Sequence, residues 1–118
     1  IDDRNSGKTK EVLRGQLSKA CYNIDSTLLN ILVIAYEPVW AIGTGITATT
    51  DMISETLCDI RSILCNNGLN GDGISILYGG SVSENNAANL SEIEDLDGFL
   101  IGGASLSVEE FYSIYKQI

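Results

Sequence analysis

Residues 31–45 read ILVIAYEPVWAIGTG, and this stretch decides the fold. It begins with five apolar residues, 31–35, as expected of a strand that is buried on both faces of a parallel sheet. A carboxylate, Glu37, follows at the end of the predicted strand, and Pro38 then stiffens the chain as it leaves. The Gly-Thr-Gly stretch 43–45 can adopt backbone angles that other residues avoid. The sequence therefore predicts a charged group at a strand tip, beside a loop that moves as a unit between two hinges.

Predicted helices and strands alternate along the whole chain. Predicted helices cover 6–22, 51–66 and 83–91, with a last one beginning at Ser107, and predicted strands cover 31–36, 74–78 and 98–101. Strands that recur about every 25–40 residues, with helices between them, indicate βα units with right-handed crossovers. The sequence therefore predicts an α/β fold with about four helices, whose three strands lie parallel in the order of the chain.

Apolar spacing predicts which side of each helix is buried. The stripes are Val12, Leu13, Leu17, Ala20 and Cys21 in the first helix, Ile53, Leu57, Ile60 and Leu64 in the second, and Val108, Phe111, Tyr112 and Tyr115 in the last. The second helix should end at the Asn-Asn-Gly stretch 66–68. Ser107 and Glu110 have the spacing of a capping box, which predicts the start of the last helix.

The composition limits the classes of function. The 118 residues are 44% apolar, enough for one modest core, and carry a net charge of −9, which argues against nucleic-acid or anionic-membrane partners. Five of the seven basic residues fall within positions 4–19, mixed with acids, which predicts a solvated helix face. No apolar run approaches the roughly 18 residues of a membrane span, and the first residues do not resemble a signal peptide. We therefore expect a soluble, intracellular protein.

Cysteine and histidine usage excludes several kinds of site. Cys21, Cys58 and Cys65 form no C-x-x-C pair, and their odd number suits reduced, mostly buried thiols. The chain has no histidine, so metal-ligand clusters and histidine-based nucleophile systems have no candidate. We expect neither a metal nor a cofactor.

Glycine-rich turns follow the other two predicted strands. Residues 79–81 read Gly-Gly-Ser after one strand, and residues 102–103 read Gly-Gly after the next. The carboxyl ends of parallel strands share one edge of the sheet, which is where α/β proteins bind ligands. Backbone N–H groups of paired glycines, with helix N-termini behind them, favour an anion. Either pair alone is typical of a tight turn, but together with 43–45 they predict a phosphate held by backbone amides.

Three stretches resemble the signatures of one family in their order and spacing. They are AYEPVWAIGTG at 35–45, YGGSV at 78–82 and GFLIGGASL at 98–106. Residues 5–9, NSGKT, also resemble that family's entry into the helix before the first of these strands. On these motifs the chain resembles the C-terminal part of the triosephosphate isomerases, whose fold is a (β/α)8 barrel. The resemblance implies that residues 1–118 belong to a single barrel domain and supply its last three strands, and a chain that begins at Ile1 without methionine fits that expectation.

The resemblance also implies a role for each motif. Glu37 would be the general base that moves a proton between neighbouring carbons, through an enediolate, to interconvert dihydroxyacetone phosphate and glyceraldehyde 3-phosphate. The substrate phosphate would be held by Gly43, Ser81, Gly102 and Gly103. The lid that excludes water would comprise Pro38, Val39, Trp40, Ala41, Ile42, Thr44, Gly45, Ile46, Thr47 and Ala48. Tyr78 and Ser81 would latch the closed lid.

The chain departs from the family pattern in two respects. Ile46 stands where the family often has lysine. The family's electrophilic histidine and its active-site lysine come from earlier strands, and no residue here matches either, so the isolated chain is expected to be inactive. The dimer-forming loop is missing too, and the resemblance implies a homodimer only for the full-length protein, a cytoplasmic enzyme of glycolysis and gluconeogenesis.

Two other interpretations remain open. One is a non-catalytic fragment that keeps only the phosphate-binding turns. The other is a different phosphate-binding barrel enzyme, such as a sugar-phosphate epimerase, which shares the glycine-rich strand ends. The stretch 37–45 argues against the epimerase, because those enzymes lack it.

Overall fold

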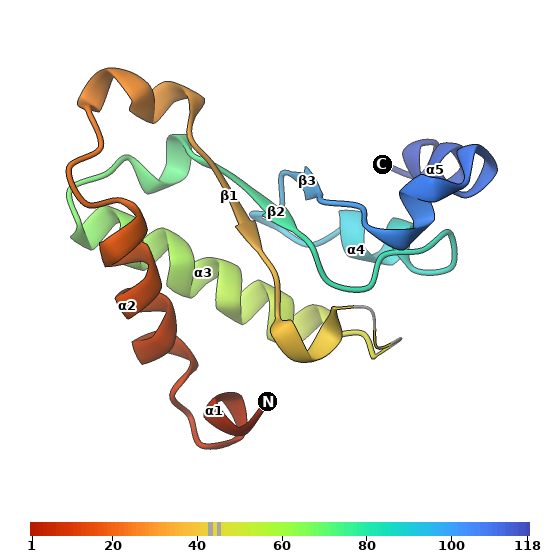
Figure 1. The fold of residues 1–118 in the computed structure, drawn as a ribbon, viewed down its shortest axis with the longest axis horizontal. Coiled ribbons are helices and arrows are strands. Elements are labelled where there is room, and N and C mark those ends of the chain that lie inside the picture. The colour runs from red at the N-terminus through yellow and green to blue at the C-terminus, as the bar shows by residue number, and fades with distance from the viewer. Residues whose placement is uncertain (43, 45) are drawn as a thin grey trace.

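The computed structural model describes residues 1–42, 44 and 46–118. Within these residues, helices and strands alternate in the order α1 (Asp2–Asn5), α2 (Thr9–Ala20), β1 (Val33–Tyr36), α3 (Thr50–Asn66), β2 (Ser75–Tyr78), α4 (Ala87–Ser91), β3 (Gly98–Phe99) and α5 (Val108–Tyr115) (Figure 1). Short 3-10 helices lie between them at Ser26–Ile31, Val39–Ala41, Gly71–Gly73 and Gly103–Leu106.

The three strands form one parallel sheet in the order β1-β2-β3. Tyr36 pairs with Tyr78, and Tyr78 pairs with Phe99, so the last residues of all three strands lie in one row. The predicted α/β fold with three parallel strands in chain order is therefore confirmed.

Helix α3 covers one face of this sheet and forms most of the core. Its predicted stripe, Ile53, Leu57, Ile60 and Leu64, is at most 1% exposed and packs in one cluster with apolar residues of β2 and α2. The helix begins where the Thr49 hydroxyl accepts a hydrogen bond from the Met52 N–H (3.2 Å). It ends before Gly68, whose φ of +78° no longer fits a helix, as the Asn-Asn-Gly stretch predicted.

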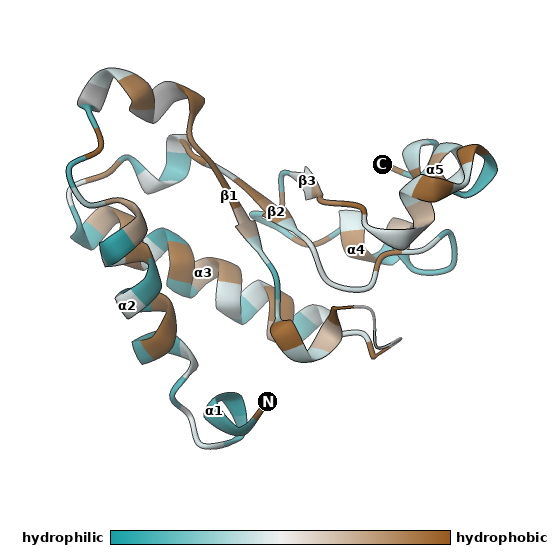
Figure 2. Cartoon of the chain, viewed as in Figure 1, coloured by the Kyte–Doolittle hydropathy of each residue, from teal (hydrophilic) through white to brown (hydrophobic). Residues whose placement is uncertain are grey.

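The opposite face of the sheet is open. Val33 is 52% exposed, and Ala35 and Ser75 are exposed beside it. Figure 2 shows that β1 carries apolar residues along this open part of the molecule. The prediction that the first strand is buried on both faces is therefore wrong, because α2 and α3 pack on one side and no described segment covers the other.

Helix α2 is shorter than predicted. It begins at Thr9 rather than near residue 6, because Gly7 has a φ of +74° that interrupts the helix. Leu13 and Leu17 are buried as predicted, but Val12 and the alanine that ends α2 are exposed, which makes the buried stripe narrower than expected.

Two other elements are also shorter than predicted. The helix predicted over 83–91 is confined to Ala87–Ser91, and the strand predicted over 98–101 is confined to Gly98–Phe99. The Leu100 N–H bonds to the carbonyl of Tyr78 (2.9 Å), and because β2 ends at Tyr78, the chain after Leu100 has no further β2 residue to pair with.

The buried side of α5 was predicted incorrectly. Its capping residue is confirmed, since the Ser107 hydroxyl accepts from the Glu110 N–H (3.2 Å). The predicted core positions Val108, Phe111, Tyr112 and Tyr115 are instead 48–80% exposed, and Ile114 is buried. The reason is that α5 turns its other side to α4, and just after α5 the Gln117 side chain accepts a hydrogen bond from the Ala88 N–H of α4 (3.3 Å).

The cysteines also differ from expectation. All three are free, but Cys58 and Cys65 are exposed because they lie on α3 away from its buried stripe. Only Cys21 is half-buried, and burial raises the pKa of its thiol.

Arg61 of α3 ties the amino end of the sheet together. Its guanidinium donates to the carbonyls of Gly71 (2.7 Å) and Ile74 (3.1 Å), and forms ion pairs with Asp95 (3.0 Å) and Asp97 (3.1 Å). The Asp97 carboxylate also accepts from a backbone N–H of β2 at 2.7 Å.

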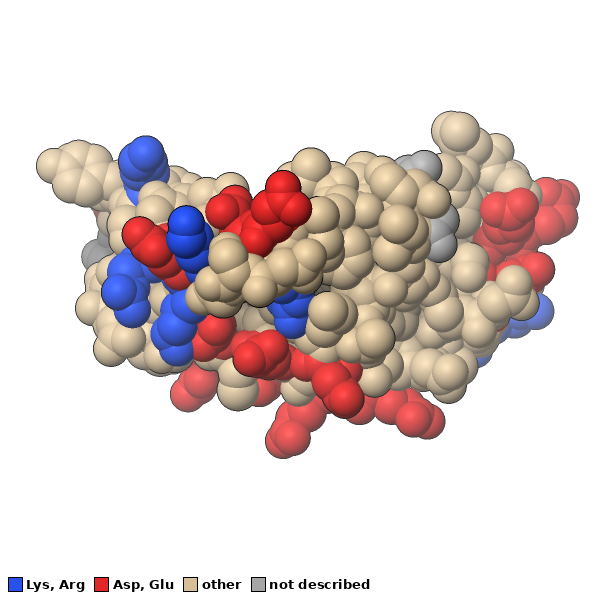
Figure 3. Space-filling model, turned by 90° about the horizontal axis from the view of Figure 1, so that it is seen from below, with Lys and Arg blue, Asp and Glu red and all other residues tan. Residues whose placement is uncertain are grey.

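Figure 3 shows how charge is distributed on one face. Lys and Arg side chains gather at one end of this face with acids among them, while acidic side chains dominate its lower rim and its other end. Lys10 pairs with Asp59 of α3, in keeping with the predicted solvated helix face. Within the described residues, no helix is both long and apolar enough to cross a membrane.

Candidate active site at the carboxyl edge of the sheet

The carboxyl ends of the three strands bring the predicted site residues to one edge. Glu37 directly follows β1, Gly79 directly follows β2, and Leu100 directly follows β3. The Gly79 N–H donates to the Tyr36 carbonyl (2.9 Å), which extends the pairing of β1 and β2 by one residue. The predicted position of Glu37 at the same edge as the glycine-rich turns is confirmed.

Gly79 makes room for the side chain of Glu37. A Cβ atom at Gly79 would lie 2.7 Å from the Glu37 Cγ and 3.1 Å from its Oε1, closer than real side chains approach. Since the Gly79 N–H is already bonded to β1, this glycine is not free to bind an anion. Its absent side chain instead allows the carboxylate to cross the end of β2.

Gly80 makes room for the side chain of Tyr78 in the same way. A Cβ at Gly80 would collide with the Tyr78 hydroxyl, because the tyrosine side chain folds back beneath the turn. Tyr78 is fully buried, and its hydroxyl forms no hydrogen bond of ordinary geometry with another described residue. Burial raises the pKa of Tyr78, and the backbone N–H of Ala48 acts in the opposite direction.

The segment after Glu37 is bonded to the turn after β2. The Ser81 hydroxyl donates to the Ala41 carbonyl at 2.8 Å, although the two residues are 40 positions apart. The Asn86 side chain holds this turn, because its Nδ2 donates to the Ser81 carbonyl (3.0 Å) and its Oδ1 accepts from the Ser83 N–H (2.8 Å). Sequence reasoning missed Asn86, whose only signal is a polar residue shortly after the turn.

Thr44 bridges the described parts of the predicted lid. Its hydroxyl donates to the Trp40 carbonyl (3.0 Å) and accepts from the Ile46 N–H (3.1 Å). Gly43, predicted to bind phosphate, and Gly45, predicted to belong to the lid, lie outside the described residues.

The remaining predicted phosphate ligands lie in open turns. Gly102 and Gly103 are exposed, and a Cβ on either would meet no described atom within 4 Å. Among the described residues, the backbone N–H groups of Ser81, Gly102 and Gly103 donate no hydrogen bond in the turns. These three amides are therefore available to an anion, unlike the amide of Gly79.

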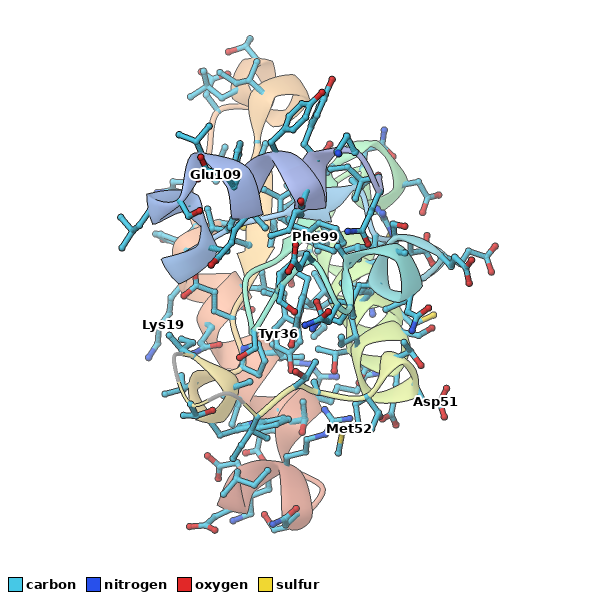
Figure 4. All side chains as sticks on the ribbon, turned by 90° about the vertical axis from the view of Figure 1, so that its right-hand side faces the viewer. Lys19, Tyr36, Asp51, Met52, Phe99 and Glu109 are labelled. Atoms are coloured by element: carbon cyan, nitrogen blue, oxygen red, sulfur yellow. The ribbon has the colours of Figure 1, made fainter. Side chains whose placement is uncertain are left out.

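Glu37 lines two cavities on the α2 side of the sheet. One, of about 380 Å³, lies between α2 and β1, and the other, of about 180 Å³, lies beneath the 3-10 helix Val39–Ala41. Neither cavity is lined by Ser81 or Gly102, so neither joins Glu37 to the predicted phosphate ligands. Figure 4 labels Tyr36, the last residue of β1, and shows it apart from Glu109 of α5 in that view.

Parallel βα units with candidate functional residues at the carboxyl edge of the sheet place the chain among the α/β proteins, in which barrels and doubly wound sheets bind their ligands at this edge. The sequence model described as triosephosphate isomerase matches residues 1–118. The chain belongs to the triosephosphate isomerase family.

Several relatives in this family are about half identical to the chain. Triosephosphate isomerase of Francisella tularensis subsp. novicida (strain U112) is 49% identical over 118 residues, which are 99% of this chain and 47% of the relative. The enzyme of that name from Vesicomyosocius okutanii subsp. Calyptogena okutanii (strain HA) is 47% identical over 117 residues, 98% of this chain and 47% of the relative. Triosephosphate isomerase of Porphyromonas gingivalis is 48% identical over 118 residues, which are 98% of this chain and 47% of the relative. The chain thus spans about half the length of the curated relatives it matches.

Proposed function

We propose that this chain carries the general base and part of the phosphate site of an enzyme that interconverts dihydroxyacetone phosphate and glyceraldehyde 3-phosphate. One observation carries the proposal. The carboxylate of Glu37 crosses the end of β2 through the space left by Gly79, at the same sheet edge as the free amides of Gly102 and Gly103. A proton acceptor and an anion site at one edge suit a substrate with a reactive carbon and a phosphate.

Glu37 acts as a reversible base in this proposal. Its carboxylate takes a proton from the carbon beside the substrate carbonyl, and the electron pair of the broken C–H bond forms the enediolate. The protonated carboxyl then returns the proton to the neighbouring carbon while the substrate's hydroxyl proton passes to the former carbonyl oxygen, which completes the exchange of aldehyde and ketone. A carboxylate suits both steps, and it becomes a stronger base when water is excluded.

The phosphate and the lid involve the turns after β2 and β3. The amides of Ser81, Gly102 and Gly103 bind the phosphate, together with Gly43. The hydrogen bond from Ser81 to the Ala41 carbonyl supports a latch between the turn and the lid, Pro38–Ala48. The Tyr78 hydroxyl, which lies near the Ala48 N–H, is the second part of that latch. A closed lid keeps water from the enediolate.

The chain's position in the barrel is also a proposal: residues 1–118 form the C-terminal part of a single barrel domain. The order of the three motifs supports it, as does the uncovered surface. The accessible area is 7302 Å², about 1,000 Å² more than the roughly 6,200 Å² expected of a folded monomer of 12.7 kDa. In the described sheet β1 and β3 each pair on one side only, and further strands of a barrel would cover both edges and the open face.

Other properties implied by the family remain predictions. These are a homodimer of the full-length protein, a cytoplasmic location, and activity without a cofactor.

Replacing Glu37 tests the proposal. In the natural polypeptide that contains this chain, Glu37→Gln should lower kcat by about 10³-fold, since general-base catalysis contributes roughly 10²–10⁴. Affinity for inorganic phosphate should stay unchanged, because the amide keeps the shape of the side chain. Glu92→Gln, the same change at the exposed end of α4, is the matched control.

Two outcomes would contradict the proposal. A Glu37→Gln variant within tenfold of the unmutated kcat would remove Glu37 from the mechanism. An unmutated natural polypeptide that binds phosphate without isomerising triose phosphates would favour the non-catalytic interpretation, which the absence of histidine in this chain keeps open.

A further inference from the structure

Arg4 is a nearly buried arginine that the proposed reaction does not use. Its side chain is 12% exposed and reaches from α1 to α3. One guanidinium nitrogen donates to the Thr56 hydroxyl (3.1 Å), and the other contacts the Met52 carbonyl (3.4 Å) and the Glu55 carboxylate (3.2 Å). A single side chain therefore holds three groups in the first two turns of α3.

These groups connect Arg4 to the C-terminal hinge of the predicted lid, residues 46–48. Thr56 is 1% exposed, and its hydroxyl donates to the Met52 carbonyl (2.7 Å), so this carbonyl is held from two directions. The N–H of Met52 in turn donates to Thr49, the residue after the last of the lid, and Ala48 is buried beside it. In Figure 4, Met52 and Asp51 lie at the end of α3 that is nearer to α1.

Arg4 also lies close to the N-terminal hinge of the predicted lid, residues 38–40. Arg4 lines the cavity of about 180 Å³ that Glu37, Pro38 and Trp40 also line. Helix α1 and the 3-10 helix Val39–Ala41 lie in the same part of the molecule in Figure 1. Arg4 thus contacts α3, the helix that follows the lid, and also lines the cavity under residues 38–40, which lead into the lid.

We propose that Arg4 is a positioning residue that fixes both hinges of the lid relative to α3. The inference rests on the proposed function, in which Pro38–Ala48 closes over the substrate. Arginine suits this role because its planar guanidinium donates several hydrogen bonds in fixed directions, which the single ammonium of lysine does not reproduce. With its hinges fixed, the lid returns to the same closed position in each cycle.

Three variants of the natural polypeptide test the inference. Arg4→Met keeps the apolar stem and removes the donors, and Arg4→Lys keeps the charge without the fixed geometry. Lys10→Met is the matched control, because Lys10 also joins the N-terminal segment to α3, through an ion pair with Asp59 that does not involve the lid. Hydrogen exchange of peptides covering 38–52 reports on the lid, and peptides covering 74–80 report on the sheet.

Arg4→Met should accelerate exchange in 38–52 by roughly tenfold, as expected for the loss of a charge-assisted hydrogen bond, and leave 74–80 unchanged. In Arg4→Lys, the exchange rate of 38–52 should lie between that of Arg4→Met and that of the unmutated protein. In Lys10→Met, it should match the unmutated protein. In the isomerase assay, Arg4→Met should lower kcat and raise KM together, because a displaced hinge affects both closure and binding.

Two results would overturn the inference. Either exchange in 38–52 stays unchanged in Arg4→Met, or it rises equally in both regions with KM unaltered, as for a residue that only stabilises the fold. If the unmutated polypeptide has no isomerase activity, the proposed function fails, and the exchange data alone then decide whether Arg4 holds the hinges.

Discussion

Replacing Gly79 by alanine should displace the carboxylate of Glu37, the proposed general base, while leaving the fold intact. The added Cβ would lie 2.7 Å from the Glu37 Cγ, whereas carbon atoms settle about 3.5–4.0 Å apart. The glutamate must therefore move by about 1 Å. Because the atoms in the way belong to an exposed, rotatable side chain, the glutamate can move without disturbing the core.

The size of the effect follows from this displacement. A misplacement of about 1 Å can lower an enzymatic rate by roughly 10²-fold, so Gly79→Ala should lower kcat by about two orders of magnitude. The φ of Gly79 is not in the left-handed region, so alanine fits its backbone and the free energy of unfolding should change by less than about 1 kcal/mol. The Gly79→Ala variant should therefore lose activity while it keeps nearly the stability of the unmutated protein.

The assay is steady-state isomerase kinetics on the natural polypeptide, with urea unfolding of the same samples. Gly98→Ala is the control, because its Cβ would come within 3.2 Å of Leu77 and of no atom of Glu37, and it should leave kcat near the unmutated value. An unchanged kcat for Gly79→Ala would show that the position of Glu37 does not depend on this glycine. A large loss of stability would show that the Glu37 side chain cannot move aside without disturbing the core.

Three further predictions concern stability and the isolated chain. Arg61→Met should lower the free energy of unfolding by about 3 kcal/mol in urea titrations, because it leaves two carboxylates and three carbonyls at the amino end of the sheet without their cation. A loss below about 1 kcal/mol would contradict this role. The pKa of Tyr78 is raised in the folded state by burial, so the contribution of Tyr78 to stability should be full below about pH 10 and fall as the pH rises above it. Tyr78→Phe should reduce the alkaline loss of stability and leave the part due to Cys21, and identical pH profiles of the two proteins would count against this. The 118-residue chain alone should show no isomerase activity in a coupled assay, because it contains no histidine to polarise the substrate carbonyl, and a rate within a hundredfold of the natural polypeptide would refute this expectation.

The sequence alone identified the features that depend on local pattern. Helix α3 was predicted within one residue at its start, because its apolar residues repeat with the helical period and its capping residues adjoin them. The strand order and the edge that carries Glu37 also followed, since consecutive βα units leave few alternative arrangements.

The tertiary structure decided which of these patterns are used for packing and which contacts form the site. The apolar face of α5 has the spacing of a buried stripe, yet it is exposed, because burial depends on what lies opposite a helix. The close approach of Glu37 to Gly79 joins residues 42 positions apart, and Arg4 reaches Thr56 across 52 positions. Such contacts leave no local periodicity in the sequence, because they arise only when the crossovers bring distant segments together.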